Sequence, residues 1–226
     1  MVYKAKAAHL GSSLSMCEIL AALYGEKKQK DDRIFISKGH AAASVYATLA
    51  LTGHIPMNML DTYFQNGSYL QGHISHHLPG IPLSTGSLGH ALPVAIGSAL
   101  ANPEHRHYVI LSDGELNEGS NWEALLFAPK HTANLTVIID YNKIQSLGTI
   151  QEVLDLEPLD DKFQAFGWKC LQVDGHNLEE LTNALGGEAK VVIAHTIKGK
   201  GIADIENTLA SHYKPPTEEQ YAHSLS

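Results

Sequence analysis

Two apolar segments of the sequence are each followed by an oxygen-bearing side chain. The run HYVILS at 107–112 leads directly into Asp113, and the run LTVIID at 135–140 is followed by Asn142, 29 positions after Asp113. If the two runs are neighbouring strands, the carboxylate and the amide lie at the same edge of a sheet. With the backbone carbonyl of Ile144 they form an oxygen donor set of the kind that Mg²⁺ uses beside phosphate oxygens. Either motif alone is more simply a surface turn, but the pair at this spacing favours a site.

The residues after Asp113 suit an anionic ligand. Gly114 has no side chain, so backbone can approach a ligand closely there. The helix predicted to follow offers free N–H groups to an anion. The chain also carries 14 histidines, a surplus that indicates a polar site, with some at the surface such as His105 and His107.

Short apolar runs alternating with helical patterns must position these residues. The runs predicted as buried parallel strands are RIFIS (33–37), HYVILS (107–112), LTVIID (135–140), WKCLQV (168–173) and KVVIAH (190–195). The predicted helices are a first one opened by a capping box at Ser15 to Glu18 and stopped by Gly25, then 40–53, 91–101, 120–128 and 177–185. This alternation predicts an α/β fold: a mostly parallel sheet with helices on both faces, in a single domain over 1–226.

Composition excludes several classes of protein. With 44% apolar and 18% charged residues, the chain is expected to fold as a globule. The formal charge of -8 argues against a nucleic-acid-binding face, and no apolar stretch approaches the ~20 residues of a membrane span. The start of the chain lacks the apolar core of a signal peptide. Cys17 and Cys170 match no metal or redox spacing, so we expect two reduced, partly buried thiols in a cytoplasmic protein.

Six segments together resemble the thiamine-diphosphate enzymes, and specifically the amino-terminal subunit of split transketolases. They are AHLGSSLSMCEILAALY (8–24), DRIFISKGHAAASVYATLALTG (32–53), LSTGSLGHALPVAIGSALA (83–101), SDGELNEGSNWEA (112–124), DYNKIQSLG (140–148) and HTIKGKGI (195–202). The resemblance covers nearly the whole chain and implies the fold that binds the diphosphate end of thiamine diphosphate. It implies transfer of a two-carbon ketol unit from a ketose, expected to be a phosphate, to an aldose.

The resemblance also implies roles for single residues. Asp113, Asn142 and the Ile144 carbonyl would bind Mg²⁺ or another divalent cation such as Ca²⁺. The expected cofactor contacts are His40, Gly86, Ser87, Leu88, Gly114, Glu118, Asn142 and His212. The expected catalytic residues, which would line the substrate channel, are His9, His73 and His212. Glu118 and Glu123 would belong to an acidic network across the interface between subunits.

The resemblance further implies a missing part. The pyrimidine-binding domain of the family has no place in this chain, so we expect it on a separate partner subunit, in a complex of two copies of each. Two other functions stay open: a thiamine-diphosphate-dependent acyl or ketol transferase of specialised metabolism acting on an α-keto acid or unusual sugar, and a non-catalytic binding subunit.

Two further motifs have simpler interpretations. The HISHH cluster at 73–77 lacks a cysteine or acid that would complete a zinc site, so we expect His76 and His77 in a polar loop. The KGKG sequence at 198–201 is too short for a nucleotide-binding loop, and by itself is expected to be a lysine-rich turn.

Overall fold

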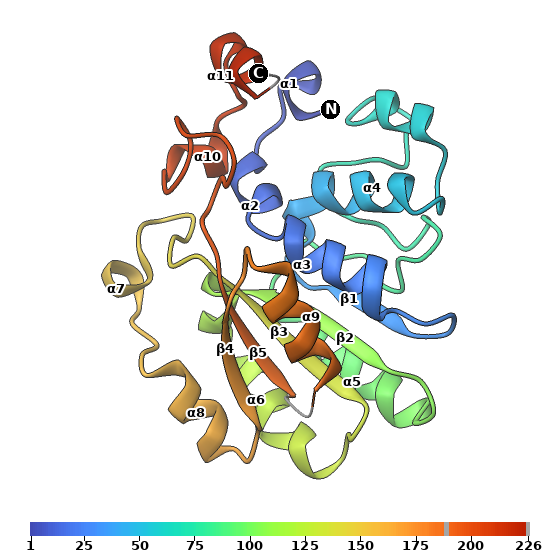
Figure 1. Ribbon diagram of the computed structural model, residues 1–226, viewed down its shortest axis with the longest axis vertical. Coiled ribbons are helices and arrows are strands. Elements are labelled where there is room, and N and C mark those ends of the chain that lie inside the picture. The colour runs from blue at the N-terminus through green and yellow to red at the C-terminus, as the bar shows by residue number, and fades with distance from the viewer. Residues whose placement is uncertain (188–189, 225–226) are drawn as a thin grey trace.

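A five-stranded parallel sheet organises the computed structural model of the chain, which describes residues 1–187 and 190–224. The strand order is β1-β2-β3-β5-β4 (Figure 1). The strands are β1 (Arg33–Ile36), β2 (His107–Ser112), β3 (Leu135–Tyr141), β4 (Cys170–Asp174) and β5 (Val191–His195). All five predicted strands are therefore confirmed, with β4 beginning two residues later than expected.

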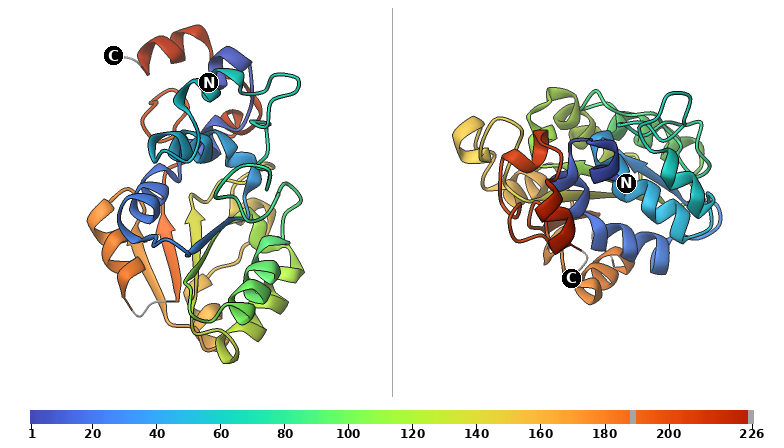
Figure 2. Two further views of the ribbon diagram at one scale, coloured as in Figure 1. Left: turned by 90° about the vertical axis from the view of Figure 1, so that its right-hand side faces the viewer. Right: turned by 90° about the horizontal axis from the view of Figure 1, so that it is seen from above.

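Helices cover both faces of the sheet (Figure 2). One face packs on α3 (Cys17–Ala21), α4 (Ala42–Leu51) and α9 (Leu178–Gly186). The other packs on α5 (Ala91–Ala101), α6 (Gly119–Phe127) and α8 (Leu159–Ala165). Alternate residues of one strand enter opposite cores: Val137 and Ile139 face α5 and α6, whereas Ile138 faces α3 and α4. The predicted fold class is confirmed.

Shorter elements complete the chain. They are α1 (Val2–Ala5), α2 (Leu10–Leu14), η1 (Ala22–Lys27), η2 (Gly39–Ala41), η3 (Met57–Thr62), η4 (Gly114–Asn117), η5 (Ala128–Lys130), α7 (Ile150–Val153), α10 (Ala210–Tyr213) and α11 (Glu218–His223). The first and last helices lie together beyond the carboxyl ends of the strands, and Tyr3 stacks on Tyr221 with ring centroids 4.3 Å apart (Figure 1). The two ends of the chain thus lie together on the side of the sheet where the site is expected.

Three local predictions are wrong for physical reasons. Ser15 does not cap the first helix, because its hydroxyl donates to the buried carboxylate of Asp140 at 2.5 Å instead. Gly25 does not stop that helix, which continues as the wider helical turn η1 as far as Lys27. His107 is fully buried because it begins a strand covered on both faces, and its ring bonds Ser98 at 3.0 Å.

The two cysteines are free, as expected, but Cys17 is exposed rather than partly buried. Cys170 is half-buried. None of the helices in the described ranges has the length and apolar character needed to cross a bilayer.

Candidate active site

The ends of β2 and β3 meet at one edge of the sheet. The strands pair directly, with Ser112 opposite Asp140, so Asp113 and Asn142 lie just beyond paired positions. The Asp113 carboxylate accepts from the backbone N–H of Gly114 at 2.7 Å and of Lys143 at 2.5 Å. The second of these bonds joins the two loops directly. The predicted meeting of the two strand ends is confirmed.

Asp113 lies in an environment that disfavours its ionised form. Its side chain is buried, and this burial, with the nearby Asp140 carboxylate, raises the pKa of Asp113 to about 6. A cation bound here would relieve both effects. The carboxylate therefore fits a metal ligand better than a turn residue.

The loop after β3 supplies the other two predicted oxygens. Lys143 adopts a left-handed backbone conformation (φ 67°), which turns the chain sharply between Asn142 and Ile144. The Asn142 side-chain oxygen accepts from the Ile144 N–H at 3.1 Å, and the Ile144 carbonyl accepts from Lys198 Nζ at 2.9 Å. One carboxylate, one amide and one carbonyl suit Mg²⁺, with coordination positions left for phosphate oxygens and water.

Gly114 allows the two loops to come close together. A Cβ at this position would lie 3.0 Å from Cγ of Gln145, which belongs to the opposite loop. A larger residue would require the Gln145 side chain to shift by a few tenths of an ångström, so glycine suits this close approach beside its expected contact with the cofactor.

A cavity of about 250 Å³ opens above this edge. Its wall contains the metal-binding candidates, two lysines, the glycine-rich loop and four histidines. The lining residues are His9, Ser12, Lys38, His40, His73, Gly86, Leu88, Ser112, Asp113, Gly114, Asn142, Ile144, Gln145, Ser146, Lys198 and His212. Segments far apart in the sequence, from the His9 loop to helix α10, thus share one cavity.

Four histidines form a cluster on one wall of the cavity. The His9 ring lies 5.3 Å from that of His40, 5.9 Å from that of His73 and 4.9 Å from that of His212, between centroids. His9 has a left-handed φ of 66°, a conformation that costs energy and often marks a functional position. His73 is exposed at the mouth, whereas the other three are half-buried. The cluster can contact a polar substrate at several points.

The three half-buried histidines are neutral near pH 7. Burial and the Lys198 ammonium lower the pKa of His212 to about 3. Burial also lowers the pKa of His9, and burial together with Lys38 lowers that of His40 well below its usual value. Neutral imidazoles both donate and accept hydrogen bonds, so these rings suit the hydroxyl groups of a sugar.

The residues 198–201 form a turn, as expected, but the first lysine of this turn is buried in the cavity wall. Lys198 is only 1% exposed, and its ammonium reaches the Ile144 carbonyl and, at 3.2 Å, Nδ1 of His212. Burial and the charge of Lys38 lower the pKa of Lys198 to about 8. The buried Lys198 ammonium lies beside the predicted diphosphate site. Its neighbours in the sequence include two glycines and are those of an ordinary turn, so they do not indicate this location.

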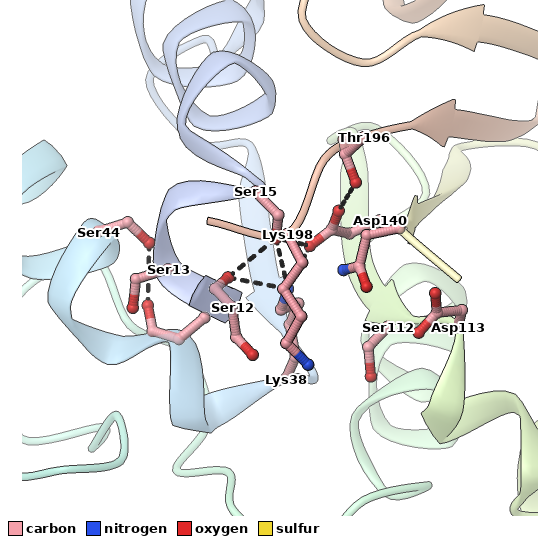
Figure 3. Close-up of polar contacts among 12 residues, drawn as sticks. Ser12, Ser13, Ser15, Lys38, Ser44, Ser112, Asp113, Asp140, Thr196 and Lys198 are labelled. Carbon is pink, nitrogen blue, oxygen red and sulfur yellow. Dashed lines mark hydrogen bonds and ion pairs between the residues drawn. The ribbon is translucent and has the colours of Figure 1, made fainter. Parts of the chain in front are cut away.

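A buried ion pair lies at the floor of the site. Lys38 donates to the Asp140 carboxylate, to which Thr196 also donates a hydrogen bond (Figure 3). Lys38 Nζ further donates to the Ser12 carbonyl at 3.0 Å. The pair and its hydrogen bonds join the loops after β1 and β5 to the end of β3 and to helix α2. Neither residue was predicted to belong to the site, because nothing in the sequence shows that they meet.

Glu115 is a second buried acid that was not predicted. Its carboxylate accepts from the Ser37 hydroxyl and, at 2.9 Å, from the backbone N–H of Gly89. Burial raises the pKa of Glu115, and these hydrogen bonds oppose that rise. Glu115 therefore holds the glycine-rich loop against the ends of β1 and β2.

Three predicted site residues lie outside the cavity. Ser87 is exposed and does not line it, although Gly86 and Leu88 do. Glu118 and Glu123 are exposed at the start of α6. Neither glutamate faces the cavity, so any contact of Glu118 with the cofactor requires a different arrangement from the one seen here. Within the described ranges no group of three or more His, Cys, Asp or Glu side chains is arranged to hold a metal ion.

The family model for "Transketolase, thiamine diphosphate binding domain" matches residues 1–224. The chain belongs to the transketolase family. It is 41% identical over 234 residues to a 6-deoxy-6-sulfo-D-fructose transketolase subunit of Clostridium sp. (strain MSTE9), covering 94% of this chain and 85% of that protein. It is 38% identical to an apulose-4-phosphate transketolase subunit of Phocaeicola vulgatus, covering 100% of this chain and 87% of that protein.

Solved transketolases share the fold. The enzyme of Campylobacter jejuni superposes with a TM-score of 0.91 at 30% identity, over 99% of this chain and 39% of that one. The transketolase of Leishmania mexicana gives 0.90 at 29% identity, over 99% and 38%. The chain thus corresponds to about two fifths of these transketolases but to most of the relatives named as subunits.

These comparisons confirm three of the predictions. The chain is an amino-terminal subunit of the split transketolase type, it has the α/β fold that binds thiamine diphosphate, and its function is that of a transketolase-type transferase. The cation, the roles of single residues, the partner and the substrate are proposals.

Proposed function

We propose that the chain binds the diphosphate of thiamine diphosphate through a divalent cation and becomes active when a partner subunit covers the cavity. The observation that carries this proposal is that Asp113, Asn142 and Ile144 share one cavity with Lys198 and the four-histidine cluster. A site for a cation and diphosphate and a site for sugar hydroxyls thus adjoin.

The residues present fit Mg²⁺ and the diphosphate. Asp113, Asn142 and the Ile144 carbonyl would hold the cation, with Ca²⁺ as an alternative of the same oxygen-ligand chemistry. Lys198 would neutralise a diphosphate oxygen, and the backbone around Gly86 and Leu88 would border the cofactor. Thiamine diphosphate, when bound, supplies the carbon chemistry that breaks and forms the carbon–carbon bond.

The four-histidine cluster would orient the ketose and move its protons. His9, His73 and His212 would hydrogen-bond the sugar hydroxyls, and His40 would lie nearest the diphosphate. Because burial keeps the pKa of His9 low, its neutral ring is available to accept a proton from a hydroxyl near pH 7. Nδ1 of His212 accepts from Lys198 Nζ at 3.2 Å, so its neutral ring would carry the proton on Nε2 and donate a hydrogen bond to the sugar.

A surface beside the cavity suits the partner subunit. Helices α5 and α6 pack side by side and expose Val94, Leu126 and Phe127, and α6 and the residue before it also expose the carboxylates of Glu123 and Glu118. Exposed apolar residues bordered by charge are typical of protein–protein interfaces. We propose that the pyrimidine-binding subunit joins here, with two copies of each subunit in the complex, and that the glutamates face it.

The names of the relatives support an anionic ketose as substrate. Those relatives are named for 6-deoxy-6-sulfo-D-fructose and for apulose-4-phosphate, and both names describe a subunit. We propose a phosphorylated or similarly anionic ketose as donor for this chain. An α-keto acid donor, as in related acyl transferases, is the alternative, and the cytoplasmic location is a further part of this proposal.

The test combines the purified chain, a pyrimidine-binding partner, thiamine diphosphate and Mg²⁺. We expect ketol transfer from a sugar phosphate by the mixture, and none by the chain or the partner when each is assayed separately. Activity of the chain alone would refute the shared site. Turnover of α-keto acids but not of ketoses would select the acyl transferase function, and cofactor binding without turnover of any donor would select the non-catalytic function.

A further inference from the structure

His176 lies outside the cavity yet touches the loop that carries Lys198. It follows β4 and precedes α9, and its Nε2 accepts from the backbone N–H of Ile197 at 2.8 Å. Ile197 is the residue before Lys198. The side chain of His176 is 11% exposed and does not line the cavity.

The hydrogen bonds define the tautomer of His176. A backbone N–H can only donate, so Nε2 must be unprotonated. The ring proton is then on Nδ1, which donates to Oε2 of Glu18 on α3 at 3.0 Å. The contact with Glu18 is therefore a hydrogen bond to a neutral imidazole. It orients the ring so that the acceptor Nε2 faces Ile197.

Close packing keeps the His176 turn against this loop. A Cβ on Gly175 would lie 2.9 Å from the His195 carbonyl oxygen, and the Gly175 N–H donates to that oxygen at 2.7 Å. Only glycine permits this approach. The contact between Gly175 and the His195 backbone thus fixes the turn. The His176 imidazole adds a second hydrogen bond at Ile197, two residues after His195.

The loop itself has few ways to move Lys198. Thr196 is tied to Asp140, and the Gly199 N–H donates to the Gly11 carbonyl at 3.0 Å. His176 holds Ile197 between those two anchors. The direction of the Lys198 side chain toward the Ile144 carbonyl depends on the peptide that His176 fixes.

We propose that His176 is a positioning residue for the cofactor site, acting through Ile197 to place the Lys198 ammonium against the cofactor's diphosphate. The proposal rests on the proposed function, because it assigns Lys198 to a diphosphate oxygen. Glu18 contributes by holding the tautomer of the ring.

Two isosteric variants separate the two hydrogen bonds of the ring. In His176→Gln the amide oxygen takes the place of Nε2 and retains an acceptor for Ile197. In His176→Asn the amide takes the place of Nδ1, so it reaches Glu18 but not Ile197. The assembled complex with Mg²⁺ is titrated with thiamine diphosphate by calorimetry, and the KM of the donor ketose is measured in parallel.

We expect His176→Asn to weaken thiamine diphosphate binding about tenfold and His176→Gln less than about threefold, because only the first variant loses the hydrogen bond to Ile197. The KM of the ketose should change less than about twofold in both, since neither variant alters the histidines proposed to bind it. In a double-mutant cycle, His176→Asn should have little further effect once Lys198→Met has removed the ammonium. Melting temperatures of the variants without cofactor serve as the control for folding.

Distinct outcomes identify what fails. If the unmutated complex does not bind thiamine diphosphate, the proposed function is wrong. If it binds, but His176→Asn and His176→Gln weaken binding equally, or His176→Asn keeps its full effect in the presence of Lys198→Met, the positioning role is wrong. No effect of Lys198→Met would overturn the positioning role as well.

Discussion

The buried ion pair between Lys38 and Asp140 makes a strong prediction about stability. Asp140 is fully buried and Lys38 is 1% exposed, so Asp140→Asn leaves a buried ammonium without its counter-charge. Such losses cost about 3–5 kcal/mol. Lys38 keeps the Ser12 carbonyl at 3.0 Å and the Ser15 hydroxyl at 3.4 Å, so we expect the lower end of that range, about 3 kcal/mol. For a chain of this size that lowers the melting temperature by about 6–12 °C.

The assay is urea unfolding of the purified chain at neutral pH, followed by circular dichroism. The double variant Asp140→Asn with Lys38→Met removes both charges, so it should recover about half of the loss. Asp31→Asn, at an exposed position, is the matched control and should change the free energy of unfolding by less than about 0.5 kcal/mol. A loss below about 1 kcal/mol for Asp140→Asn, or a double variant no more stable than the single one, would refute the reasoning.

Three further predictions concern the site. Asp113→Ala should abolish Mg²⁺-dependent binding of thiamine diphosphate by the assembled complex, and an unchanged affinity in calorimetry would show that the cation lies elsewhere. His73→Ala should lower turnover of the ketose at least about tenfold while changing cofactor affinity less than about threefold, because His73 lies at the mouth of the cavity; equal losses would instead assign it to the diphosphate. The folded-state pKa of His212, about 3, lies below the unfolded value of 6.5, so this group's contribution to stability is present above pH 6.5 and is lost as the pH falls. When the pH falls from 7 to 5, the free energy of unfolding should decrease in both proteins, and the decrease should be about 1–2 kcal/mol smaller for His212→Asn than for the unmutated chain. Urea titrations measure this difference, which we have reduced for the partial exposure of the ring.

The sequence was sufficient for the fold. Buried strands have apolar residues on both faces, so the five runs could be recognised without knowledge of their neighbours. Asp113 and Asn142 could also be predicted, because each follows a strand and the carboxyl ends of parallel strands share an edge. The bounds of the helices were less certain, since Ser15 had an equally good local role as a cap and a distant one with Asp140.

The sequence by itself determined the strands, their order of alternation with helices, the family and the two oxygen-bearing strand ends, because these depend on local periodicity and short motifs. Only the tertiary structure decided that Lys198 is buried in the cavity, that Lys38 meets Asp140 and that His176 supports Ile197. Each of these contacts joins residues that are distant in the sequence or gives a residue an environment that its neighbours in the sequence do not indicate. A lysine in a glycine-rich turn has the same local pattern whether it points to water or to a ligand, and only the packing of other loops around it removes the water.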